Sequence, residues 1–326
     1  MIARRIAIAI AILALIAVPY AITEAYYVNI ASQILLYAIF ALGLNILVGY
    51  AGLVSLGHAG LFGVASYAVA SLLVAGYGHT VAILGALAIG LVFTAGFAAL
   101  SLRATGISFI MITLALGEIL WGLAYRWISL TNGDNGINVA GRPKPFGISL
   151  TSAAAFYDTT LIVFLAAVVA CAIFVRSPFG AALAGTRDQP RRMNALGYHV
   201  WMIRFGAFMF SGLLTAVAGI LYVYYNRFIS PQTLALPASA EALLMVISGG
   251  AGTLLGPIVG AALVVIIKNV VSAYVVRWNF MLGAIFVAIV VFMPEGIVPG
   301  VARLSRSAWR AMSGGKKAVP VVEPKP

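Results

Sequence analysis

The sequence contains few charged residues. Only 9% of its 326 residues are Asp, Glu, Lys or Arg, and 63% are hydrophobic. Because soluble domains carry about 25% charged residues, this chain lacks the polar side chains that would cover a soluble surface. Its uncharged runs have the length of about 20 residues that a membrane-spanning helix needs. The expected fold class is therefore all-α, a polytopic helical membrane protein, since lipid admits only helices or closed barrels.

Cysteine and histidine are also scarce. Cys171 is the single cysteine, which excludes an internal disulfide and most thiolate metal sites. The three histidines, His58, His79 and His199, are far apart and fall in different expected layers. We therefore expect neither a metal site nor a resident cofactor.

A nucleotide-binding P-loop is absent as well. The sequence contains no G-x-x-x-x-G-K-[ST], and "SGGKKAVP" near the end lacks both the first glycine at the required spacing and the hydroxyl residue. We expect this chain to be non-catalytic and unable to bind ATP in the usual way. Energy for any transport would come from a separate subunit or from an ion gradient.

Ten apolar segments are predicted to cross the membrane. The last three are ambiguous, because "MVISGGAGTLLGPIVGA" fits either two helices meeting near Gly252–Pro257 or one re-entrant element plus one span, and eight crossings is the alternative count. The predicted spans cover about 6–23, 30–48, 56–76, 81–101, 107–127, 158–175, 204–226, 238–253, 256–275 and 279–294.

We expect one transmembrane domain over residues 1–298 and a basic, disordered tail over 299–326. The first segment, "MIARRIAIAIAILALIAVPYA", has the charged start and apolar core of a signal peptide. We interpret it as an uncleaved span, because every later segment also inserts.

Lysine and arginine indicate the orientation, since they concentrate in cytoplasmic segments. With both termini in the cytoplasm, 14 of the 20 Lys and Arg residues lie inside. The outer set is Arg126, Arg142, Lys144, Arg227, Lys268 and Arg277. We interpret the net charge of +12 as a basic inner face in contact with anionic membrane lipid, with no role for nucleic acid.

The stretch "GYAGLVSLGHAGLFG", residues 49–63, is unusually rich in glycine for an apolar region. Small residues let helices approach closely in lipid, and polar groups in a span mark a bundle interior or a pathway. We predict a break in the helix at the first glycines and, for the set as a whole, either close helix packing or the lining of a substrate path. The set is Asn45, Gly49, Gly52, Ser55, Gly57, His58, Gly60 and Gly63.

The inner segment of about 177–203 contains "DQPRRMNALG", which has helix signals at both ends. Asp188 is placed to meet the positive N-terminus of a helix, Pro190 suits the first helical position, and Gly197 suits the left-handed stop. A helix of about two turns is expected, with Met193 and Leu196 on one face. It could be a linker or a knob that docks on a partner.

The outer loop "TNGDNGINVAGRPKPFGISL", residues 131–150, is predicted to be turn-rich. The span before it carries Glu118 in the middle of an apolar run. A charge there costs a few kcal/mol, so Glu118 is expected to face the bundle, to be paired or to be protonated. Thr113 is expected on nearly the same side and joins the candidate pathway set.

Five dispersed motifs resemble those of LivM-type permeases, the inner-membrane subunits of branched-chain amino acid ABC importers. The resemblance covers about residues 30–295, with the motifs in the same order and spacing. They are "LNILVGYAGLVSLGHAGLFGVASY", "ISFIMITLALGEI", "TNGDNGI", "RDQPRRMNALGY" and "SGLLTAVAGILYVYY".

The resemblance implies a role for two of these motifs. The glycine-rich segment would belong to the bundle through which substrate passes, and the inner segment would dock in a cleft of the ATPase. The residues implied in this ATPase coupling are Arg187, Asp188, Arg191, Ala195, Leu196 and Gly197. Relatives often carry an acidic residue where Gln189 stands, which puts a specific ion pair there in doubt.

The resemblance also implies partners and a place in the cell. The partners are a LivH-like second permease, two ABC ATPases that bind ATP, and a periplasmic substrate-binding protein. The location is the bacterial inner membrane. The expected function is ATP-driven import of branched-chain or other hydrophobic amino acids.

Three alternatives remain open from the sequence. The same type of importer could carry urea, short amides or aromatic acids, because specificity rests largely with the binding protein. A proton-coupled secondary transporter could use Glu118 as its proton site. A structural membrane scaffold is the remotest alternative.

Overall fold

The structure is a computed structural model that describes residues 13, 15–20, 24–139, 152–271, 278–293, 295–301 and 303. These residues are almost entirely helical, which confirms the expected polytopic helical fold. Five helices in this part of the chain are long and apolar enough to cross a membrane. They begin at residues 25, 79, 107, 153 and 200.

The helices follow the predicted spans closely. The longer elements are α2 (Ala25–Asn45), α3 (His58–Val74), α4 (His79–Ser101), α5 (Ile107–Arg126), α7 (Ala153–Arg176) and α10 (Val200–Asn226). The shorter elements are α6 (Ile128–Thr131), α8 (Pro178–Asp188), α9 (Pro190–Ala195), α11 (Leu236–Gly249), α12 (Gly256–Ile266), α14 (Trp278–Phe292), the 3₁₀ helices η2 (Gly133–Asn135) and η4 (Pro231–Leu234), and the π-helices η1 (Ile46–Ala51) and η5 (Ile267–Val271).

The predicted first span lies largely outside the described residues, although residues 15–20 are helical. Helix α7 begins at Ala153, five residues before the predicted span, because Ser152 caps it by accepting a hydrogen bond from the backbone N–H of Ala155 at 3.1 Å. Residues 297–301, at the start of the predicted tail, are helical, and residues 304–326 lie outside the described part.

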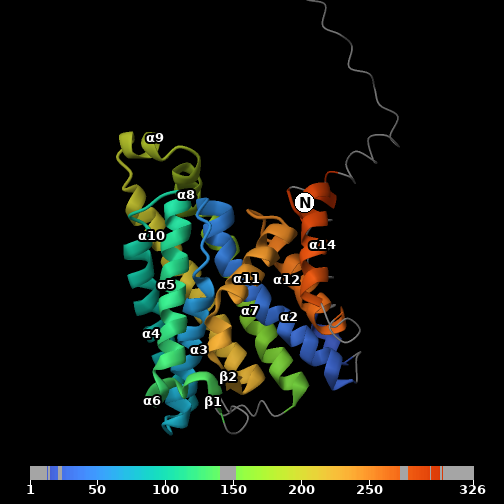
Figure 1. Ribbon diagram of the computed structural model, residues 1–326. Coiled ribbons are helices and arrows are strands. Elements are labelled where there is room, and N and C mark those ends of the chain that lie inside the picture. The colour runs from blue at the N-terminus through green and yellow to red at the C-terminus, as the bar shows by residue number, and fades with distance from the viewer. Residues whose placement is uncertain are drawn as a thin grey trace, which may run out of the picture.

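Most helices run between two ends of the molecule (Figure 1). One end carries α8, α9 and the turn between α4 and α5, and we call it the coupling end. The opposite end carries α6 and a two-stranded ribbon, in which β1 (Ile137–Asn138) pairs antiparallel with β2 (Phe228–Ile229). The coupling end therefore collects the segments that the charge pattern assigns to the cytoplasm.

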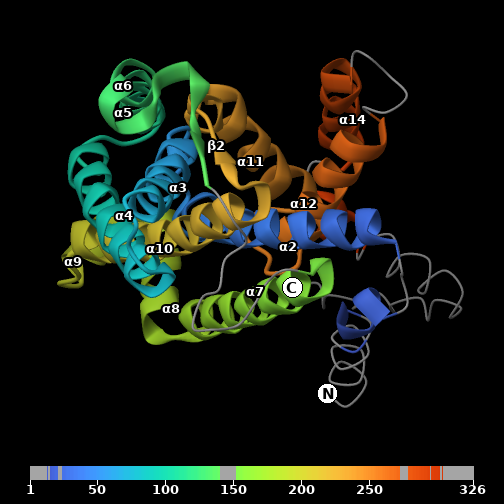
Figure 2. The ribbon, with the colours of Figure 1, turned by 90° about the horizontal axis from the view of Figure 1, so that it is seen from below.

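Helix α2 forms the centre of the bundle. Figure 2 shows it between α7 on one side and α11 and α12 on the other, and it also packs against α10. Its second half, from Leu35 to Asn45, is buried on nearly every face except at Tyr37. A helix that is apolar all round belongs in an interior. By contrast, α5 and α7 bury one stripe each and leave wide apolar faces exposed.

The ambiguous region after residue 236 forms two helices. Helices α11 and α12 pack closely against each other and are joined by the turn at residues 250–255, which lies toward the coupling end. At about 1.5 Å per residue α11 is only about 21 Å long, shorter than the roughly 30 Å of a bilayer core. The two helices form a hairpin that meets at this turn, as one of the two interpretations expected, and the number of crossings, ten or eight, stays a prediction.

Candidate functional site

The helix break falls at Gly52. Helix α2 ends in the π-helix η1, Gly52 has a φ of +69°, and the chain forms no regular helix or strand until α3 begins at His58. The backbone N–H of Leu53 donates to Leu47 O at 2.8 Å across the break. Glycine is needed because this backbone conformation is unfavourable for other residues, and because a Cβ here would lie 2.7 Å from Cγ of Arg187.

Three polar side chains from this region form one buried chain of hydrogen bonds. Nδ1 of His58 lies 2.8 Å from Oγ of Ser55, and Nε2 of His58 lies 2.9 Å from Oγ of Ser211. Ser211 donates its hydroxyl hydrogen to Gly43 O at 2.6 Å, so it must accept from His58. Nε2 of His58 therefore carries a hydrogen that it donates to Ser211, and each of the three side chains is fully buried.

The glycines at 57, 60 and 63 bring α3 against its neighbours. A Cβ on Gly57 would overlap the carbonyl oxygen of Thr113, and one on Gly60 would lie 3.3 Å from Cα of Gly117 on α5. A Cβ on Gly63 would overlap the side chain of Leu234 in η4. These contacts are the close approach that small residues permit. A role for the same glycines in lining a substrate path stays a prediction.

Thr113 and Glu118 lie on different sides of α5, which corrects the expectation that they share one. Five residues turn a helix by about 140°. Thr113 is buried, and its Oγ1 accepts a hydrogen bond from the N–H of Leu56 at 3.2 Å. Glu118 is partly exposed, and among the described residues it has no hydrogen-bond or ion-pair partner.

Asn45 joins the centre of the bundle to the hairpin turn. Its Nδ2 donates to Thr253 O at 2.9 Å, and its Oδ1 accepts from the N–H of Gly252 at 2.9 Å. Gly49 lies beside the same turn, and a Cβ there would overlap the backbone of Gly252. The side chain of Asn45 thus satisfies two backbone groups of a turn that no helix ladder can satisfy.

The coupling segment, about residues 177–203, contains two short helices, α8 and α9, where the sequence predicted one. Ser177 caps α8 by accepting from the N–H of Gly180 at 3.2 Å. Pro190 occupies the first turn of α9, and Gly197 has a φ of +86°, as expected. Asp188 was placed at a helix N-terminus and is instead the last residue of α8. Its carboxylate pairs with Arg187 at 2.8 Å.

Two contacts anchor this segment to the bundle. Nη1 of Arg187 donates to Gly49 O at 2.8 Å, and Nη2 of Arg204 donates to Thr186 O at 2.7 Å. Leu183 is fully buried. The part of the segment from Pro190 onward projects outward, since α9 has no buried residue and Leu196 is 64% exposed. Arg191, Ala195 and Gly197 are exposed as well, and their contact with an ATPase stays a prediction.

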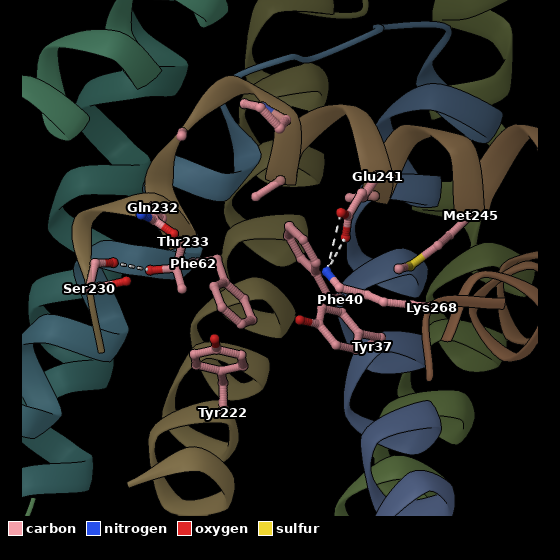
Figure 3. A pocket seen from close by; sticks show the side chains of 14 residues that line it. Tyr37, Phe40, Phe62, Tyr222, Ser230, Gln232, Thr233, Glu241, Met245 and Lys268 are labelled. Carbon is pink, nitrogen blue, oxygen red and sulfur yellow. Dashed lines mark hydrogen bonds and ion pairs between the residues drawn. The ribbon is translucent and has the colours of Figure 1, made fainter. Parts of the chain in front are cut away.

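A cavity of about 430 Å³ lies between α2, α3, α10, η4 and α11 (Figure 3). Aromatic rings form a row along it, with ring centres 6.5 Å apart for Tyr37 and Tyr222, 5.3 Å for Tyr222 and Phe62, and 4.9 Å for Phe62 and Phe40. An ion pair between Glu241 and Lys268 also lines the cavity.

Nζ of Lys268 lies 3.0 Å and 3.2 Å from the two carboxylate oxygens of Glu241. The sequence analysis did not single out this pair, because Glu241 falls within the predicted span 238–253 and Lys268 is counted among the outer charges. A usable signal existed: two opposite charges stand in apolar segments on the two sides of the hairpin turn, and such charges mark functional sites in membranes.

Comparison with known proteins identifies the family. The family described as "Branched-chain amino acid transport system / permease component" matches residues 26–290. The chain is 29% identical to the high-affinity branched-chain amino acid transport system permease protein LivM of Escherichia coli, over 89% of this chain and 73% of that protein. The LivM of Salmonella typhimurium is 28% identical over the same shares.

A second group of relatives has another name. The autoinducer 2 import system permease protein LsrC of Escherichia coli is 29% identical over 71% of this chain and 68% of that protein. No solved structure gives a significant match. The match over residues 26–290, together with the bundle of apolar helices, shows that this chain belongs to the family of permease components of branched-chain amino acid transport systems.

Proposed function

We propose that this chain is one of two permease subunits of an ATP-driven importer for branched-chain or other hydrophobic amino acids. The observation that carries the proposal is the family match over residues 26–290, with LivM proteins among the relatives. The other subunits would be a LivH-like permease, two ATPases that bind ATP, and a periplasmic binding protein that delivers substrate. Urea, short amides and aromatic acids remain the alternative substrates for the same type of importer.

The exposed α9 supports the proposed contact with an ATPase. This helix is short and lies outside the bundle, and Leu196, which follows its last residue, is exposed. Exposed apolar side chains on a projecting element are typical of protein interaction sites. The link from Arg187 to Gly49 O then gives the docked segment a direct contact with the break in the central helix.

The proposed orientation puts the coupling end and both termini in the cytoplasm. A cysteine-labelling experiment tests it, because Cys171 is buried and can be replaced by alanine to give a background without thiols. Cysteine introduced at exposed Ala195 should react with a membrane-impermeant maleimide only in inside-out vesicles. Cysteine at Asn132, at the ribbon end, should react only in right-side-out vesicles. The reverse pattern would overturn the orientation.

Uptake in proteoliposomes tests the function. The permeases and ATPases are reconstituted with trapped ATP, a binding protein is added outside, and uptake of labelled leucine, urea, acetamide and benzoate is compared. We expect ATP-dependent leucine uptake that persists when an uncoupler collapses the proton gradient. Uptake that needs the gradient and ignores ATP would support the proton-carrier alternative instead.

A further inference from the structure

We propose that the cavity between η4, α10 and α11 is a binding site for a zwitterionic amino acid with an apolar side chain. The site would hold the substrate within the permease after the binding protein releases it. This inference rests on the proposed function, because it names the substrate class that the cavity fits.

The ion pair supplies one half of the recognition. A free amino acid carries an ammonium and a carboxylate on one carbon, and Glu241 and Lys268 present the two complementary charges 3.0 Å apart. An entering amino acid can place its ammonium beside Glu241 and its carboxylate beside Lys268. Neither side chain is fully buried, since 21% of Glu241 and 35% of Lys268 remain exposed, so each can be reached from the cavity.

A role in stability alone explains the ion pair between Glu241 and Lys268 less well than a role in binding. Charges inside a membrane bundle are expensive and mark functional sites by default. A buried ion pair is also weak evidence for stability, because desolvation can exceed the Coulombic gain. In this bundle both members of the ion pair line a cavity, and apolar side chains do not enclose them on every side.

The aromatic row supplies the other half. Figure 3 shows the rings of Tyr37, Phe40, Phe62 and Tyr222 between the ion pair at one end and Ser230, Gln232 and Thr233 at the other. A substrate whose charged end lies at the ion pair would therefore direct its side chain along the rings. Burial there stabilises an apolar side chain in proportion to its area, which favours leucine over glycine or urea.

The size and position of the cavity fit such a ligand. A volume of about 430 Å³ falls at the lower end of the usual range for small-molecule sites, about 300–1,000 Å³. Its polar rim comes from Ser230 and the η4 helix, near the ribbon at the end opposite the coupling segment. In the proposed orientation that is the side from which a periplasmic binding protein would deliver substrate.

Protection of a cysteine in the cavity wall tests the site in the full complex. Ala238 lines the cavity, and Ala238→Cys in a Cys171→Ala background keeps both charges in place. Three ligands are compared: L-leucine, L-leucinamide, which lacks the carboxylate, and 4-methylpentanoate, which lacks the ammonium. We expect L-leucine to slow maleimide labelling of this cysteine, and the other two to need at least tenfold higher concentrations.

Two charge variants assign the contacts. In the same background, Glu241→Gln should raise the half-protecting concentration of L-leucine at least tenfold and abolish its advantage over 4-methylpentanoate. Lys268→Met should abolish its advantage over L-leucinamide. The double variant Glu241→Lys with Lys268→Glu keeps the ion pair, and its assembly with the partner subunits checks that the hairpin still folds.

The proposed binding site would be wrong if L-leucine did not protect the introduced cysteine from labelling. It would also be wrong if L-leucine protected it no better than L-leucinamide and 4-methylpentanoate. Uptake separates this failure from failure of the proposed function. If the wild-type complex imports leucine with ATP but the cysteine is never protected, the cavity assignment alone is wrong. If no ATP-dependent leucine uptake is found, the proposed function is wrong and the cavity assignment, which rests on it, fails too.

Discussion

The glycine-rich segment and the coupling segment are both short interruptions between long helices, yet they are built in opposite ways. Residues 49–63 are almost entirely buried, their polar side chains are paired within the chain, and their glycines lie against neighbouring backbone. Residues 190–199 contain no buried residue and expose Leu196 and Tyr198.

The comparison teaches where this subunit is complete and where it needs another chain. A segment whose contacts are all internal contributes to the stability of the subunit by itself. A segment with exposed apolar side chains gains its stabilisation only on assembly. Substitutions in the first segment should therefore affect folding, and substitutions in the second should affect association.

Gly57→Ala should have the largest effect, because the new Cβ would meet the carbonyl oxygen of Thr113, which belongs to the backbone of α5 and cannot move freely. Overpacking of this kind costs about 3 kcal/mol. The measurement is thermal unfolding of the detergent-solubilised complex, together with leucine uptake. Gly96→Ala on α4 is the matched control, because a Cβ there meets nothing within 4 Å. Equal melting temperatures for the two variants would contradict the packing.

Asn45→Ala should follow in size. It leaves the N–H of Gly252 and the carbonyl of Thr253 without their partner inside the bundle, at a cost of about 2 kcal/mol. Hydrogen exchange of the turn at residues 250–255 is expected to accelerate. Asn226→Ala is the control, since its side chain donates only an exposed bond of 3.3 Å to Tyr222 O. An unchanged exchange rate in Asn45→Ala would show that the turn at residues 250–255 is stable without the two hydrogen bonds to Asn45.

Leu196→Asp should leave the stability of the subunit unchanged and weaken its assembly with the ATPase. A charge in an apolar contact is expected to lower ATPase affinity about tenfold, or about 1.4 kcal/mol. Copurification of the ATPase and substrate-stimulated hydrolysis measure this. Leu130→Asp, an exposed leucine at the ribbon end, is the control. If substrate stimulated ATP hydrolysis in Leu196→Asp as strongly as in the wild type, the proposed contact of α9 with the ATPase would be wrong.

Glu118→Gln should have the smallest effect. Because Glu118 is partly exposed and has no partner among the described residues, the free energy of unfolding should change by no more than about 0.5 kcal/mol. ATP-dependent uptake should remain substantial, because glutamine keeps the shape and only the ionisable group is lost. Uptake abolished by this substitution, and by an uncoupler in the wild type, would point to a proton carrier.

Local features of the fold could be predicted from the sequence, and long-range ones could not. The left-handed stop at Gly197 and Pro190 in the first turn of α9 follow from residues that are close neighbours in the chain. The placement of Asp188 was wrong because α8, a helix that the sequence analysis did not predict, extends to that residue and ends just before Pro190. That Thr113 and Glu118 lie on different sides of α5 could have been predicted from helical periodicity alone.

The sequence by itself determined that this protein is a bundle of apolar helices, because composition and run length decide which segments can lie in lipid. It also determined where the central helix breaks, because few residues other than glycine tolerate the backbone of Gly52. Only the tertiary structure decided that His58 meets Ser211, that Asn45 holds residues 252 and 253, and that Glu241 faces Lys268. These partners come from helices far apart in the chain, and their meeting depends on how whole helices pack, which no local pattern of residues encodes.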